Sequence, residues 1–130
     1  VTQFRREGTG TGFIANTSSA TSYATSQSDR RAKKNFEDWT ESVLSHFKDL
    51  KPTKFHFTQE DDSSEKNKGY IAQDLVESFP EAYPTKNDGE DADRYFFNPS
   101  GMVVYLMKAI QEQQLLIETL QTEVSALKGA

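Results

Sequence analysis

The last 30 residues carry an unbroken heptad pattern, and this pattern limits the possible folds more than any other feature of the chain. Pro99 suits a first helical position, because its fixed φ and missing N–H are tolerated there, and Asn98 or Ser100 could cap the helix. No Gly or Pro occurs from Met102 to Lys128. The sequence therefore predicts a helix over about 99–128, roughly 40 Å long at ~1.5 Å per residue.

Eight positions of this helix alternate spacings of three and four residues, which is the a/d seam of a coiled coil over about four heptads. The seam consists of Val103, Leu106, Ile110, Gln113, Ile117, Leu120, Val124 and Leu127. The alternative is a single helix packed on its own domain, but the region ahead of it is too small to cover residues 111–128. Glu123 at a g position and Lys128 at the next e position favour parallel strands.

The heptads leave the number of strands open. β-branched residues at a with Leu at d favour a dimer, whereas a buried layer of Gln113 amides could fix a three-stranded register.

The rest of the chain alternates short strand and helix signals, so the predicted fold class is α+β: a small mixed domain followed by the long helix. Residues 1–27 predict two strands joined by a glycine turn, and two strands alone do not form a stable sheet. We therefore interpret this segment as the end of a larger β-rich protein. The other expected elements are helices over 36–50 and 73–79, strands over 54–58 and 69–72, and polar, mobile loops over 59–68 and 86–93.

Composition excludes several classes of function. The 130 residues hold 15 Lys and Arg against 20 Asp and Glu, a net charge of −5, so we expect no nucleic-acid partner. There is no Cys, and no apolar run approaches the roughly 18 residues of a membrane span, so we expect neither a thiol site nor a membrane partner. The acidic loops lack the EF-hand order, and His46 and His56 have no partner at ligand spacing, so no metal or other cofactor is expected.

Residues 28–35 carry the distinctive local chemistry. A serine nucleophile needs a base, and the neutral amine of a lysine can serve, so Ser28 and Lys33 form a candidate pair. Five residues turn about 140° around a helix, so the two cannot meet on one helical face. Either Ser28 precedes the helix and the chain turns back, or the lysine comes from another subunit. The alternative is that Ser28 caps a helix in which Asp29 and Lys33 form an ion pair.

The segment resembles the opening signature Ser-Asp-x-Arg-x-Lys-x-Asn of the intramolecular chaperone family of endosialidases and phage tail spikes and fibres. The matching positions are Ser28, Asp29, Arg31, Lys33 and Asn35. Residues 69–75 with 79–82, which include Gln73, and residues 109–112 resemble two later motifs of the family in the same order.

The resemblance implies a boundary between residues 1–27, the end of the parent fibre, and residues 28–130, the chaperone domain. It implies a homotrimer that assists the folding of the upstream fibre part of the same chain. It also implies autoproteolysis of the Gln27–Ser28 bond, with Ser28 as nucleophile, Lys33 as base, and Asp29, Arg31, Asn35 and Gln73 in support. The expected setting is the host cytoplasm during virion assembly, with release from the mature fibre after cleavage.

Two other functions compete with this expectation. One is a permanent trimeric or adhesive module at a fibre tip that keeps the fold and never cleaves. The other is the related self-cleaving segment of membrane-tethered transcription factors, which the missing apolar span disfavours.

The seam predicts that charge at its centre prevents assembly. We expect the double variant Ile117→Asp, Leu120→Asp to be monomeric or poorly folded, because it places carboxylates in the apolar contact. Thr119→Asp with Thr122→Asp adds the same charge outside the seam and should leave the oligomer intact. Light scattering measures the mass of each, and an unchanged oligomer in the first variant would refute the coiled coil.

Overall fold

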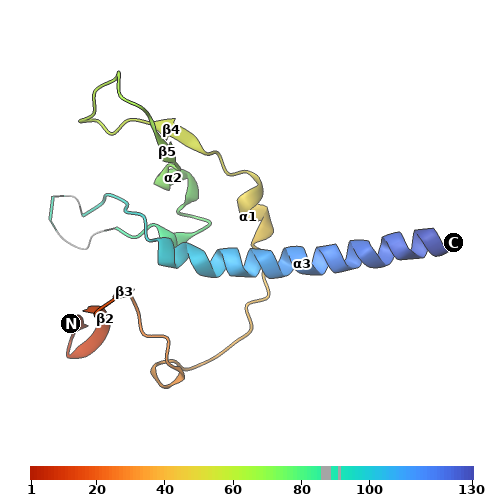
Figure 1. Ribbon diagram of the computed structural model, residues 1–130, viewed down its shortest axis with the longest axis horizontal. Coiled ribbons are helices and arrows are strands. Elements are labelled where there is room, and N and C mark those ends of the chain that lie inside the picture. Colours follow the sequence, from red (N-terminus) through yellow and green to blue (C-terminus); the bar gives the residue numbers. More distant parts are fainter. Residues whose placement is uncertain (86–88, 91) are drawn as a thin grey trace. The chain divides into compact units, whose positions relative to one another are not determined.

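A computed structural model describes residues 1–85, 89–90 and 92–130, and its helices and strands are labelled in Figure 1. The chain divides into two compact units, residues 1–40 and residues 41–130, which are described separately below. The predicted boundary between residues 27 and 28 is the bond at which the chain would be cut, and the division into compact units does not test it. It stays a prediction.

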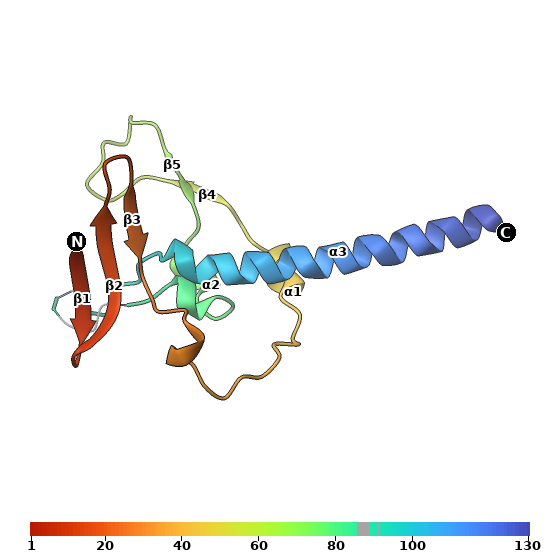
Figure 2. The same cartoon turned by 60° about the horizontal axis from the view of Figure 1, so that its bottom comes forward.

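The first unit opens with a three-stranded antiparallel sheet in the order β1 (Thr2–Arg6), β2 (Thr9–Asn16), β3 (Thr21–Ala24), seen in Figure 2. Glu7 and Gly8 connect β1 to β2 with φ of 51° and 81°, the positive values that a type I′ hairpin turn requires at both positions. The two predicted strands are therefore confirmed. The glycine pattern predicted a turn over 8–10, and the observed turn begins one residue earlier, at Glu7. Strand β3 was not predicted.

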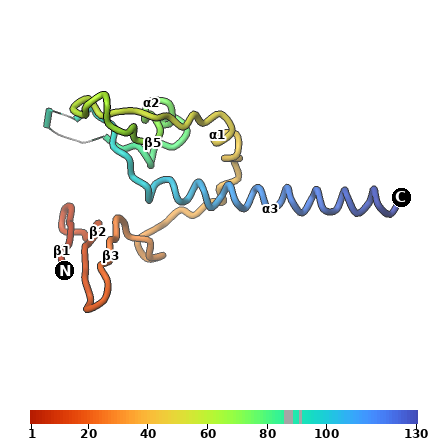
Figure 3. Tube along the Cα trace, turned by 45° about the horizontal axis from the view of Figure 1, so that its top comes forward, coloured from red at the N-terminus to blue at the C-terminus, as the bar shows by residue number. Residues whose placement is uncertain are grey.

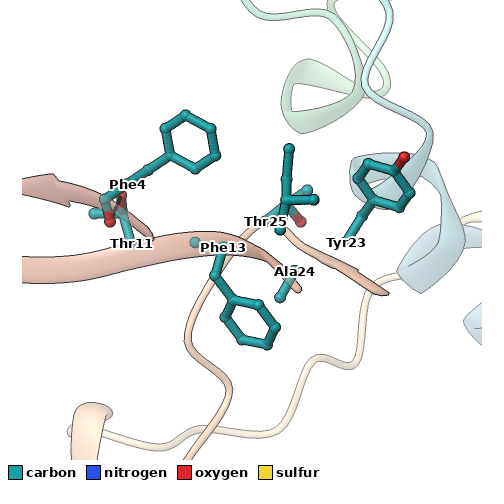
Figure 4. Close-up of a pocket in the computed structure, with 8 residues that line it drawn as sticks. Phe4, Thr11, Phe13, Tyr23, Ala24 and Thr25 are labelled. Atoms are coloured by element: carbon teal, nitrogen blue, oxygen red, sulfur yellow. Dashed lines mark hydrogen bonds between the residues drawn. The ribbon is translucent and has the colours of Figure 1, made fainter. Parts of the chain in front are cut away.

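This sheet has no core of its own. No residue of the first unit is buried, and the aromatic rings of Phe4, Phe13 and Tyr23 are 53%, 41% and 73% exposed. Figure 4 shows Phe4 and Phe13 pointing to opposite sides of β1 and β2. Both faces of the sheet thus present apolar side chains to solvent, as expected of a fragment that needs partners.

The predicted helix over 36–50 is wrong for most of its length. A single 3₁₀ turn, η1 (Arg30–Ala32), follows the sheet, and helix α1 covers only Leu44–Lys48. Phe36 and Trp39 are 60% and 42% exposed, so the apolar face that the spacing predicted is only partly buried. Helical periodicity stabilises a helix chiefly through such burial.

The second unit contains α1, strands β4 (Thr53–Phe55) and β5 (Asn67–Gly69), helix α2 (Ala72–Leu75), the 3₁₀ turn η2 (Pro80–Ala82) and helix α3 (Pro99–Gly129). Its core forms where α1, α2 and η2 meet the first turns of α3. Phe79 at its centre is fully buried, with ring centroids 4.9 Å from Phe47 and 5.1 Å from Tyr105. The buried side chains are those of Val43, Leu75, Phe79, Ala82, Tyr83, Tyr105 and Ala109.

The middle elements are shorter than predicted. β4 ends at Phe55 rather than Thr58, and its partner β5 lies at 67–69 rather than 69–72. Glu60 explains the early pairing, since its carboxylate accepts hydrogen bonds from the Phe57 N–H (2.6 Å) and the Asn67 side-chain amide (2.8 Å) and so closes the connection between the strands.

The predicted helix over 73–79 is also shorter in the structure. α2 ends before the predicted residue 79, because Ser78 and Phe79 both turn back to the Leu75 carbonyl ahead of Pro80. Mobility of the 59–68 loop stays a prediction, and residues 86–88 and 91 of the second predicted loop lie outside the described residues.

Helix α3 runs over 31 residues, as the heptad pattern predicts, with Asn98 at the N-cap position and Pro99 in its first turn. The predicted α+β class, with short antiparallel strands and a long C-terminal helix, is confirmed. One face of α3 packs on its own unit through Met102, Tyr105 and Ala109. On the same face the Glu112 carboxylate accepts a hydrogen bond from the Val43 N–H at 2.9 Å. A hydrogen bond with the Ser42 side chain, followed by the one from Val43, lowers the pKa of Glu112.

The predicted seam lies on a different face of α3. Its seven aliphatic residues are between 45% and 78% exposed, and Gln113 is exposed as well. In Figures 1 and 3 the C-terminal half of α3 has no other segment of its unit beside it. The alternative of a helix that buries this seam on its own domain is therefore wrong. Pairing with other chains stays a prediction.

Gly101 allows α3 to approach η2 closely. A Cβ at this position would lie 2.1 Å from the Glu81 carbonyl oxygen, so we expect Gly101→Ala to lower the free energy of unfolding by about 2 kcal/mol or more. Gly129 lies in the same helix with open space around it, and Gly129→Ala should be neutral or stabilising. Denaturant unfolding at fixed protein concentration measures both. Equal stability of the two variants would refute the close contact.

Tyr105 predicts a loss of stability in alkali. Burial, with a hydrogen bond donated to the Glu81 carboxylate and the charge of that carboxylate, raises the pKa of Tyr105 from 10.0 to about 12. Between pH 10 and 12 the unfolded chain ionises this phenol while the folded chain does not. The free energy of unfolding should therefore fall by about 2 kcal/mol as pH rises through this window. Tyr105→Phe should remove this part of the fall, and an unchanged pH dependence in that variant would contradict the assignment.

Candidate active site around Ser28

Ser28 and Lys33 are brought together by one turn of backbone. Ser28 lies after β3, Asp29 is the N-cap of η1 with extended backbone (ψ 138°), and Lys33 is its C-cap, also extended (φ −125°, ψ 152°). The chain thus turns back over Arg30–Ala32, and the Lys33 Nζ donates a hydrogen bond to the Ser28 Oγ at 3.0 Å. This distance is within the range for a nucleophile and its base.

The turn satisfies the geometric condition that the sequence set, since the two residues do not share a helical face. It also makes the alternative interpretation wrong in both parts. Asp29, not Ser28, caps the helical turn, and the Asp29 carboxylate pairs with Arg31 rather than with Lys33.

Asp29 and Arg31 form a closed pair beside Ser28. The Asp29 Oδ1 accepts from the Arg31 N–H (2.8 Å) and Nε (2.9 Å), and the Oδ2 accepts from Nη2 (2.9 Å). The Arg31 side chain, followed by its backbone N–H, lowers the pKa of Asp29, and the same bonds raise the pKa of Arg31. The aspartate charge is therefore matched by a guanidinium, which leaves the Lys33 amine directed at Ser28.

Two neighbouring residues shape the turn through their backbone and ring. Asn35 has φ of 56°, a left-handed conformation that Asn adopts more readily than most residues, and it directs the chain away from η1. The Arg30 guanidinium lies 4.8 Å from the centroid of the Phe36 ring, a cation–π contact. The motif residues Asp29, Arg31, Lys33 and Asn35 are thus collected in one short segment with Ser28.

Gln27 makes a contact that no sequence pattern indicated. Its side-chain Nε2 donates a hydrogen bond to the Gly10 carbonyl of β2 at 2.6 Å. With Asp29, Arg31 and Ala32 it also lines a depression of about 500 Å³ beside Ser28. Gln27 and Gly10 are 17 positions apart, which explains why no local pattern revealed the contact.

Ser28 and Lys33 are both exposed in the single chain. A lysine acts as a base most readily where water is excluded or other cations are near. The turn therefore provides the contact between the two groups, and solvent still reaches both of them.

Gln73, the remaining motif residue, belongs to the second unit. It lies exposed in α2 and lines an aromatic hollow of about 560 Å³ with Phe57, Tyr70 and Phe97 among others. Its supporting role in cleavage stays a prediction.

Neither a metal centre nor a membrane span is found in the part of the chain that the structure describes. Within residues 1–85, 89–90 and 92–130, no three His, Cys, Asp or Glu side chains gather into a group that could hold a metal ion. The helices described there lack the length and apolar character needed to cross a bilayer.

Residues 28–83 match the model of a peptidase family described as chaperone of endosialidase. The match begins at Ser28 itself and includes both Lys33 and Gln73. No curated protein and no solved structure matches the chain.

Proposed function

Since residues 28–83 match the model of the chaperone of endosialidase family, we propose that the chain is the C-terminal intramolecular chaperone of a phage tail-spike or tail-fibre protein, and that it cuts itself at Gln27–Ser28. The observation that carries the proposal is the 3.0 Å hydrogen bond between Lys33 Nζ and Ser28 Oγ, at the first residue of the family match.

The chemistry proceeds in two steps. The neutral Lys33 amine takes the proton of the Ser28 hydroxyl while Oγ bonds to the Gln27 carbonyl carbon. The bond from that carbon to the Ser28 nitrogen then breaks, and the nitrogen takes up a proton, which leaves an ester between Gln27 and the Ser28 side chain. Water hydrolyses the ester and produces a Gln27 carboxylate and a chain that begins at Ser28. One peptide bond and one water molecule are consumed.

Assembly precedes cleavage in this proposal. The exposed seam of α3 supports a parallel coiled coil, for which the family resemblance implies three strands, and the sheet without a buried residue supports a role as the end of a trimeric fibre. The partners are two further copies of the chain and the upstream fibre part of the same chain. The setting is the host cytoplasm during virion assembly.

The exposure of Ser28 and Lys33 supports the same order of events. In the single chain water reaches both groups, whereas packing between subunits would exclude it and favour the neutral amine. Cleavage confined to the trimer then releases the chaperone only after the fibre has assembled.

Removal of the base tests this mechanism. Lys33→Arg keeps the positive charge but cannot accept a proton near neutral pH, so we expect at least a 100-fold loss of cleavage rate with folding and assembly unchanged. Lys34→Arg makes the same substitution at the next position and should cleave at the normal rate. Mass spectrometry of purified protein over time follows the fragment that begins at Ser28.

Ser28→Ala removes the attacking oxygen and should stay full length as a trimer. Normal cleavage of Lys33→Arg would refute the pair of catalytic residues, and cleavage by an isolated monomer would refute the order of events. A wild-type trimer that stays whole would favour the permanent, non-cleaving fibre module.

A further inference from the structure

The hydrogen bond from Gln27 to Gly10 occupies a defined place in the sheet. β2 and β3 pair in register as far as Phe13 with Ala24, and β2 continues beyond this pair toward Gly10. If the same register were extended, Gly10 would lie opposite Gln27. The backbone pairing stops at Ala24. At the position where the ladder would have continued, the Gln27 side-chain amide donates a hydrogen bond to the Gly10 carbonyl.

The Gly10 carbonyl is open to this donor because β3 pairs with β2 only as far as Phe13 and leaves the edge of β2 at Gly10 uncovered. On the other side of β2, Gly10 pairs with Arg5. A Cβ at Gly10 would lie 2.6 Å from the Gln3 Nε2, whereas its distance of 3.9 Å from the Gln27 Nε2 would be an ordinary contact.

Gln27 also carries the carbonyl carbon that Ser28 attacks in the proposed reaction. Its backbone is linked to Ser28 on one side, and its side chain is tied to β2 on the other. Attack requires the oxygen and the carbonyl carbon to be held close and aligned, and loss of such alignment lowers the rate even where the reacting groups are intact.

We infer that Gln27 is a positioning residue, whose side-chain amide fixes the Gln27–Ser28 bond to strand β2 of the fibre end. This inference rests on the proposed self-cleavage. It adds that the bond is held for attack only when β1 and β2 have formed, so that cleavage depends on the fold of the last fibre strands as well as on the chaperone.

Gln27→Met and Gln27→Glu test the inference in the full-length trimer. Methionine has nearly the length of glutamine and no donor, and we expect it to slow cleavage by about fivefold, the effect of losing one exposed hydrogen bond. A glutamate carboxylate cannot donate to a carbonyl, but its protonated form can. The rate of Gln27→Glu relative to the wild type should therefore rise as pH is lowered from 8 to 5, whereas the relative rate of Gln27→Met should not change with pH.

Thr17→Val is the matched control. It removes side-chain hydrogen bonds at the other end of the same sheet, where the Thr17 Oγ1 donates to the Ala20 carbonyl (3.4 Å) and accepts from the Ala20 N–H (3.1 Å), and it leaves the Gln27 anchor in place. Its cleavage rate should stay within about twofold of the wild type, the margin expected for a surface substitution away from the site. Melting temperatures of the three variants, each combined with Ser28→Ala, separate effects on the sheet from effects on cleavage.

The outcomes are distinct. If the wild type cleaves and Gln27→Met cleaves equally fast, the inference is overturned and the proposed function still holds. Equal slowing of Gln27→Met and Thr17→Val would also overturn it, because the effect would then belong to the sheet in general. A wild-type trimer that does not cleave would overturn the proposed function and this inference together.

Discussion

The packing of Phe79 between α1 and the first turns of α3 is the contact on which the second unit depends. Phe79 is fully buried in a unit with few buried side chains, and it contacts the rings of both Phe47 and Tyr105. The approach is possible because Gly101 lets α3 lie against the Glu81 backbone, and the hydrogen bond from Tyr105 to the Glu81 carboxylate reinforces the contact. The start of the long helix is thereby fixed to its own domain.

As a result, two faces of α3 have different roles. Met102, Tyr105 and Ala109 pack on the domain, and Glu112 extends this face to the backbone of Val43. The heptad seam lies on another face and stays exposed along the whole helix. The domain can therefore fold around the first three turns of α3 without using the surface proposed for assembly.

The first unit combines a sheet without a core and a turn with reactive groups. Its apolar side chains are exposed on both faces, while the Ser28–Lys33 contact needs only η1 and the Asp29–Arg31 pair, all within six residues. The contact is thus local, and the proposed reaction gains its dependence on folding from two other sources. One is exclusion of water on assembly, and the other is the link from Gln27 to β2.

The sequence by itself determined the features that repeat or act at short range. The heptad period specified α3 almost to its ends, because helix length and phase follow from residues three and four apart. The motif from Ser28 to Asn35 identified the candidate site and the condition that its chain must turn back, and the hairpin signals located β1 and β2.

Only the tertiary structure decided which apolar residues are buried and which residues far apart in the sequence come into contact. Phe36 and Trp39 have helical spacing but stay 60% and 42% exposed, and the helix in the structure is limited to Leu44–Lys48, whereas Tyr105 and Ala109 are buried although they lie outside the seam. The hydrogen bonds from Gln27 to Gly10 and from Val43 to Glu112 join residues 17 and 69 positions apart. No local pattern encodes them, because burial and long-range hydrogen bonding depend on how the elements pack, and the spacing of residues along the chain reports only the elements themselves.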